Sequence, residues 1–156
     1  RNHLQLLFLA LAGVRPSGRA GLLDSLVQVG SRVRRRSWVG VISDGMEEPQ
    51  TWLPALGGFA RQRTDLNFFH VFDDGEFGLA FDRAALFYSP EGGEALAVDP
   101  VGAKKAFQEV SEEYLDEVEG GVVRWGGRYH RVSTRQPLEV TLRRLVNGPT
   151  DGRLRA

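Results

Sequence analysis

The sequence has no cysteine, no net charge and no long apolar run. Without cysteine there can be no disulfide, no thiolate metal site and no cysteine nucleophile. Lys and Arg together number 20, as do Asp and Glu, so no overall field attracts nucleic acid or an anionic membrane. The longest apolar run, from Leu6 to Val14, is too short to span a bilayer. We therefore expect no nucleic-acid partner and no membrane insertion by this segment.

The apolar content is sufficient for one packed domain. Of the 156 residues, 42% are hydrophobic, and the chain shows no internal repeat and no linker between domains. We expect a single domain over residues 1–149 and a flexible tail over residues 150–156, which has nothing to bury. The chain starts without methionine and already reads as a helix at Asn2, so we expect the domain to be incomplete at its N-terminus.

Hydrophobic periodicity predicts alternating helices and strands. Two of the strands are apolar without alternation, so we expect both of their faces to be buried, as in a parallel sheet between helices. This pattern predicts a three-layer α/β sandwich with a mainly parallel sheet and helices on both faces. The predicted helices are Leu4–Ala12, Ala20–Arg35, Thr51–Arg63, Val101–Glu119 and Pro137–Val146. The predicted strands are Trp38–Ser43 and Leu66–Phe72, both doubly buried, then a hairpin of Ala85–Ser89 with Ala95–Val98, and Arg128–Ser133.

Ser43, Asp44 and Gly45 directly follow the first buried strand. In open α/β sheets the carboxyl ends of the strands form the edge where ligands and metals bind. The sequence therefore locates a candidate site, although a single carboxylate does not define a reaction. A second acidic cluster, Asp73–Glu76, follows the next buried strand, and we interpret it as a polar turn rather than a Mg²⁺ site.

Two catalytic motifs are matched only in part. Residues Gly13–Ala20 have the glycine spacing of a phosphate-binding loop, but they lack its lysine and its metal-binding hydroxyl. Ser43 lies at a strand end, as in a nucleophile elbow, yet Val41 stands where that turn needs glycine. His70 lies inside an apolar strand, where we expect a hydrogen-bonded core residue rather than a catalytic base.

The order of the segments carries more information than any one of them. A helix, a turn, a second helix and a strand with an acidic end are followed by further turns at characteristic places. The turns and strand ends concerned are Arg15–Ala20, Ile42–Gly45, Asp73–Glu76, Tyr88–Asp99, Tyr129–Thr134 and Pro137–Leu138. This series resembles the C-terminal half of the family called domain of unknown function fifty-eight, which is von Willebrand factor A-like. The resemblance covers residues 4–146.

The resemblance implies a metal-ion-dependent adhesion site at the C-terminal edge of the sheet. Such a site combines an Asp-x-Ser-x-Ser loop, a threonine from a glycine-rich turn and an aspartate after a later strand. Only Asp44 matches, because Ala20 stands near the threonine position and the first loop is absent from this chain. Asp44 is thus one ligand of an incomplete metal site. Either the chain is the C-terminal part of a longer protein, in which alone Mg²⁺ is expected, or it is a degenerate member of the family that binds no metal. The implied partner-binding edge consists of Ser17, Arg19, Ser43, Asp44 and Gly45.

The resemblance also implies a function. It indicates a non-enzymatic protein-binding or scaffold module of a bacterial family, an adaptor for a MoxR-type AAA ATPase. We expect it in the cytoplasm, although the parent protein could be tethered to a membrane. The alternative is a small metal-dependent α/β hydrolase or phosphotransfer enzyme that uses Asp44 with Asp73 and Asp74.

The two alternatives predict different geometry around Asp44. An enzyme should bring Asp44 close to Asp73 or to a histidine within a concave pocket. A binding module should instead show a flat, exposed edge on which the Asp44 carboxylate has no such partner.

Overall fold

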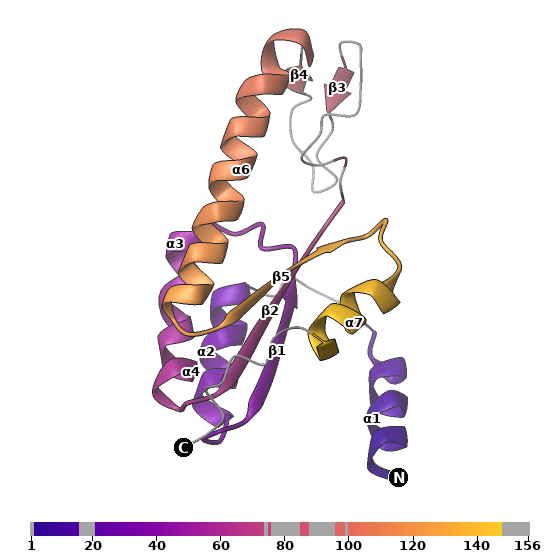
Figure 1. The fold of residues 1–156 in the computed structure, drawn as a ribbon, viewed down its shortest axis with the longest axis vertical. Helices are drawn as coiled ribbons and strands as arrows, with labels where there is room; N and C mark the ends of the chain where they lie inside the picture. Colours follow the sequence, from indigo (N-terminus) through magenta and orange to yellow (C-terminus); the bar gives the residue numbers. More distant parts are fainter. Residues whose placement is uncertain are drawn as a thin grey trace.

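The computed structural model describes residues 2–15, 21–73, 75, 85–87, 96–98 and 100–147. Three strands form one parallel sheet in the order β1-β2-β5 (Figure 1). They are β1 (Trp38–Ser43), β2 (Asp65–Phe72) and β5 (Arg128–Ser133). The α/β class and the parallel sheet are confirmed. The expected tail, residues 150–156, lies outside the described residues.

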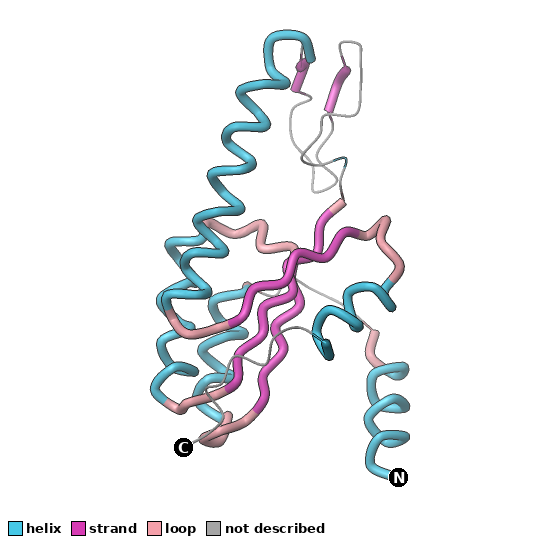
Figure 2. Tube along the Cα trace, in the orientation of Figure 1, coloured by secondary structure: helices cyan, strands magenta, loops and turns pink. Residues whose placement is uncertain are grey.

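Helices connect the parallel strands, as Figure 2 shows with helices in cyan and strands in magenta. Before β1 come α1 (Asn2–Gly13) and α2 (Leu22–Arg32); between β1 and β2 lie α3 (Pro49–Trp52), the 3₁₀ turn η1 (Leu53–Leu56) and α4 (Gly57–Arg61). A hairpin of β3 (Ala85–Phe87) and β4 (Leu96–Val98) precedes α6 (Pro100–Arg124), and α7 (Leu138–Asn147) follows β5. The single helix predicted over Thr51–Arg63 is thus three short pieces. Pro49 starts the first piece, and Pro54 lies in the 3₁₀ turn, where it removes a helical hydrogen bond.

The helices that link the strands pack on one face of the sheet and form the core with it. Trp52 stacks on Phe68 with ring centroids 5.1 Å apart, and Phe68 stacks on Tyr129 at 6.2 Å. Each such pair contributes about 0.5–1.5 kcal/mol beyond area burial. The remaining buried core residues are Leu26, Val39, Leu53, Leu56, Phe59, Leu66, Val118 and Val122. This core ties α2, the α3–α4 segment and α6 to the same face.

The opposite face of β1 is exposed. Trp38 and Ile42 expose 56% and 75% of their surface, although Val39 between them is buried. The helices α1 and α7 lie away from the core helices in Figure 1, and they do not cover these two side chains. The prediction of a doubly buried strand is therefore wrong for Trp38–Ser43. The expected helical layer on both faces is correspondingly incomplete in the described part of the chain.

Several helices leave apolar residues in contact with solvent. Every described side chain of α1 is exposed, from Leu4 to Leu11. Leu138 of α7 is also exposed, and so is Val110 in α6, whose N-terminal half extends beyond the sheet (Figure 1). Both residues recur at helical spacing with other apolar residues, a pattern that predicts inward faces, and for these two residues that prediction is wrong. No helix among the described residues is long and apolar enough to cross a membrane.

Two adjacent glycines in α6 give a matched test of this packing. A Cβ on Gly121 would lie 2.6 Å from Leu53 Cδ2, whereas nothing lies within 4 Å of a Cβ on Gly120. Alanine gains about 1 kcal/mol of helix propensity over glycine. We expect Gly120→Ala to be stabilised by about that amount, and Gly121→Ala to be about 1–3 kcal/mol less stable than Gly120→Ala because of overpacking. Urea unfolding measures both, and equal stabilities would contradict the close approach of α6 to η1.

Candidate functional site

The turn at the end of β1 is built by local hydrogen bonds. The Gly45 N–H donates to Ser43 Oγ at 3.1 Å, and the Met46 N–H donates to Asp44 Oδ1 at 3.4 Å. Gly45 has a φ of 65°, which glycine adopts without a steric penalty. The Ser43 hydroxyl therefore stabilises the turn, and this role gives no support to Ser43 as a nucleophile.

Buried side chains hold the same turn from the core side. The ring of His70 is fully buried on β2, with Nε2 2.8 Å from the Asp44 carbonyl oxygen and Nδ1 2.7 Å from the Tyr129 hydroxyl. A carbonyl oxygen only accepts, so the ring carries a proton on Nε2 and donates it to Asp44, while the Tyr129 hydroxyl lies at Nδ1. Tyr114 of α6 donates to the Gly45 carbonyl. The prediction that His70 is a hydrogen-bonded core residue is confirmed.

Both tyrosines stay protonated beneath the turn. Burial raises the pKa of Tyr129 to about 12. Burial, and after it the negative charge of Asp44, raises the pKa of Tyr114. A tyrosine that keeps its proton keeps its hydrogen-bond donor. The tyrosine hydroxyls that contact the Gly45 carbonyl and the His70 ring therefore keep their protons through neutral pH.

The carboxylate of Asp44 is exposed at an open groove of about 760 Å³ between α2 and β1. Glu47 lines the same end of the groove and accepts the Leu22 N–H at the start of α2. Most of the groove wall is apolar, with Leu22, Leu26, Val29, Val39, Val41 and Phe59 among its residues. The edge around Asp44 is thus hollowed, which corrects the flat surface expected for a binding module.

Asp73, at the end of β2, is engaged by other groups. Its Oδ1 accepts the Gly75 N–H at 2.7 Å and Arg135 Nη2 at 3.4 Å, and its Oδ2 accepts the Thr134 hydroxyl at 2.9 Å. The bond from Gly75 is the largest cause of its lowered pKa, followed by the bond from Thr134. These contacts join β2 to the turn after β5. Among the described residues, the carboxylates of Asp73 and Asp44 have no hydrogen-bond partner in common.

The structure describes part of the predicted site. Ser43, Asp44 and Gly45 form one turn, as expected, while Ser17 and Arg19 lie outside the described residues, as do Asp74 and Glu76. Within the described ranges, no group of three His, Asp or Glu side chains could hold a metal ion. Asp44 is therefore the one predicted metal ligand whose position can be assessed. Glu47 lines the same end of the groove, but the two carboxylates do not make up such a group of three.

The support of the turn by two tyrosines is not visible in the sequence. The apolar spacing puts Tyr114 on the inward face of its helix, but Tyr114 is 69 residues from Gly45, the residue it contacts. Tyr129 contacts His70 across 59 residues. The available signal is an inward aromatic side chain with a polar tip, which must find a partner when buried.

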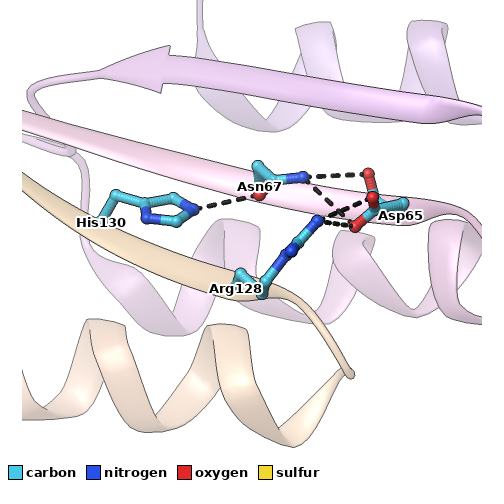
Figure 3. A network of polar contacts seen from close by, with 4 residues as sticks. All are labelled: Asp65, Asn67, Arg128 and His130. Atoms are coloured by element: carbon cyan, nitrogen blue, oxygen red, sulfur yellow. Dashed lines mark hydrogen bonds and ion pairs between the residues drawn. The ribbon is translucent and has the colours of Figure 1, made fainter. Parts of the chain in front are cut away.

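A separate polar network lies on the other face of the sheet (Figure 3). Asp65 accepts two bonds from Arg128 Nη2, at 2.6 and 2.7 Å, and one from Asn67 Nδ2 at 3.3 Å. His130 Nε2 is 3.0 Å from Asn67 Oδ1. Burial is the main cause of the lowered pKa of His130, and the positive charge of Arg128 adds to it. The network satisfies the buried Asn67 and joins β5 to β2, so its role is structural.

Comparison of the chain with protein-family models, with curated proteins and with solved structures gives no significant match. The fold and the site define an α/β protein with a parallel three-stranded sheet and a groove at the end of its first strand.

Gly45 and Gly126 test how closely the turn is packed. Both have a positive φ, of 65° and 79°. A Cβ on Gly45 would lie 3.0 Å from the Tyr114 hydroxyl and 3.1 Å from His70 Nε2, while nothing lies within 4 Å of one on Gly126. We expect both alanine variants to lose about 1–2 kcal/mol to the left-handed backbone. Gly45→Ala should lose a further 1–3 kcal/mol or so from weakened hydrogen bonds. Equal losses in chemical denaturation would argue against this packing.

The raised pKa of Tyr129 predicts that the protein loses stability in alkaline solution. Its pKa is raised from 10.0 to about 12 in the folded state, so its contribution is fully present below pH 10 and lost as the pH rises towards 12. We expect the free energy of unfolding of Tyr129→Phe to fall less steeply over this range, although that variant is less stable at neutral pH. Urea unfolding across the range gives both slopes. Parallel slopes would show that the hydroxyl is not buried.

Proposed function

We propose that the chain is a non-enzymatic protein-binding module whose binding surface is the turn Ser43–Gly45 and the adjoining groove. The observation that supports this most is the difference between the main-chain carbonyl and the side-chain carboxylate of Asp44. Its carbonyl oxygen is bonded to a buried ring of β2, while its carboxylate is exposed at the groove. A charged group on a rigid support binds a partner with a smaller loss of conformational entropy.

We further propose that the domain is the C-terminal part of a von Willebrand factor A-like domain of the family named above. The parallel order β1-β2-β5 and the acidic turn after β1 support this assignment. In such a domain a metal ion would bridge the aspartate and a carboxylate of the partner. Among the described residues no group of three His, Asp or Glu side chains could hold a metal ion at Asp44, so we propose that Asp44 binds a cationic group of the partner directly. A Mg²⁺ bridge belongs only to a longer protein.

The alternative, a metal-dependent hydrolase or phosphotransfer enzyme, meets part of its expected geometry, because a histidine lies close to Asp44 at a concave groove. It still has less support, because His70 bonds to the main-chain carbonyl of Asp44 and does not line the groove. The Ser43 hydroxyl accepts the Gly45 N–H, and both ring nitrogens of His70 have hydrogen-bond partners. The Asp73 carboxylate is hydrogen-bonded to Thr134 and Arg135, in the turn after β5. The contacts of these groups are therefore those of structural residues.

We propose a MoxR-type AAA ATPase as the partner, in the bacterial cytoplasm, with a parent protein that a membrane could anchor. This partner rests on the sequence resemblance alone. The equal numbers of acidic and basic residues agree with a protein partner and not with nucleic acid.

Asp44→Ala should weaken binding to a MoxR-type ATPase at least tenfold, because the partner's cation loses its counter-charge. Glu112→Ala, which removes an exposed carboxylate from α6, is the matched control and should bind like the unmodified chain. Calorimetric titration with and without Mg²⁺ measures the affinity and shows whether the ion takes part. Unchanged affinity for Asp44→Ala would overturn the proposed role, and phosphate-ester hydrolysis that depends on Asp44 would favour the enzyme.

A further inference from the structure

β1 is an edge strand, and half of its backbone groups point away from the sheet. A parallel strand bonds to a given neighbour through every second residue. The Asp65 N–H donates to the Ser37 carbonyl at 2.8 Å, which fixes the phase of this alternation. In the described part of the chain, the N–H and C=O groups at the open edge are those of Trp38, Gly40 and Ile42.

The groove runs beside this open edge and suits one extended segment. One of its walls is α2, with Leu22, Leu26 and Val29, and the other is β1 itself. The side chains of a strand point to alternate faces. A segment paired with β1 would therefore place one set of side chains in the groove, and the other set beside Ile42, which is 75% exposed.

Opposite charges lie at the two ends of the groove and give such a segment a direction. Exposed arginines lie where α2 ends and β1 begins, namely Arg32, Arg34, Arg35 and Arg36. Carboxylates gather at the other end around Gly21, where an added Cβ would lie 3.7 Å from Asp24 Oδ2 and 3.8 Å from Glu47 Oε1. Asp44 lines the same end. None of these charges belongs to an ion pair among the described residues.

We propose that β1 accepts an extended segment of a partner protein as a fourth, parallel strand. The segment has acidic residues at its N-terminal end, β-branched apolar residues at every second position and a basic residue at its C-terminal end. Main-chain hydrogen bonds to Trp38, Gly40 and Ile42 supply affinity, and the groove selects the side chains. The basic residue pairs with Asp44. The inference rests on the proposed binding function and specifies how the partner is held. In a longer von Willebrand factor A-like domain, a strand of the same domain would compete with the partner segment for this edge.

Amide hydrogen exchange followed by NMR tests strand addition residue by residue. The probe is a short synthetic peptide with acidic residues first, alternating valine and threonine in the middle, and lysines last. In the chain alone, we expect the amides of Trp38, Gly40 and Ile42 to exchange rapidly, and saturating peptide should slow them at least tenfold. Val41, which bonds to β2, should be protected in both states. Peptide binding without protection of the three edge amides would overturn the proposal.

A peptide with its terminal charges exchanged tests the direction of the added strand. For parallel addition we expect it to bind at least tenfold more weakly than the first peptide, because like charges then meet at both ends. Equal or tighter binding would overturn parallel addition. Protection of the edge amides in a dimer of the chain, without peptide, would show that a second copy occupies the edge instead.

Ile42→Pro tests whether the edge N–H is needed. Proline is tolerated in edge strands where its nitrogen faces away from the sheet, so the bonds to β2 remain. Ile42→Ala is the matched control, because it removes the exposed side chain and keeps the N–H. We expect the proline variant to lose peptide affinity at least tenfold and the alanine variant to retain it. Equal losses would contradict main-chain pairing.

A second variant covers the case in which Ile42→Pro does not fold. Val29→Trp, on the half-exposed face of α2, fills the groove without altering β1. It should weaken peptide binding at least tenfold, and unchanged binding would overturn the proposal. If the peptide does not bind but the ATPase still binds through Asp44, strand addition alone is overturned. If the peptide binds but the ATPase does not, only the proposal of the ATPase as partner is overturned.

Discussion

The hydrogen bond from the buried ring of His70 to the carbonyl oxygen of Asp44 is the contact on which the end of the sheet depends. His70 belongs to the central strand, Asp44 follows β1, and the second ring nitrogen is hydrogen-bonded to Tyr129 on β5. One imidazole therefore connects all three strands. A buried ring with two polar atoms cannot leave either unsatisfied without a penalty of about 1–3 kcal/mol. The strand ends must keep their relative positions to supply both partners.

The same requirement explains the composition of the turn. Because the carbonyls of Asp44 and Gly45 point to the core, where His70 and Tyr114 donate to them, the backbone at Gly45 must take a positive φ. A side chain there would crowd the ring and the hydroxyl, which lie against the glycine. With its backbone held in this way, Asp44 presents its carboxylate at the groove. The structural role of His70 and the proposed binding role of Asp44 thus depend on the same hydrogen bond.

The sequence predicts the bounds of the strands well, and it predicts less well which of their faces are buried. Arg128–Ser133 was placed at its observed bounds because a short strand is visible in local pattern. Trp38–Ser43 was also placed correctly, but its faces were not, because the exposure of Trp38 depends on which distant helix covers it. The turn Ser43–Gly45 could be located from the rule for parallel strand ends. The groove and the support from Tyr114 could not, since both arise from contacts between segments far apart in the sequence.

The tautomer of His70 tests the central claim most directly. Long-range proton–nitrogen NMR correlation reports which ring nitrogen carries the proton, and solvent exchange reports whether that proton is held. We predict a ring protonated at Nε2 with a slowly exchanging proton, because the Asp44 carbonyl oxygen accepts it in the core. A ring protonated at Nδ1, or one whose proton exchanges freely with solvent, would contradict this prediction, since the turn that presents Asp44 would then have no fixed support.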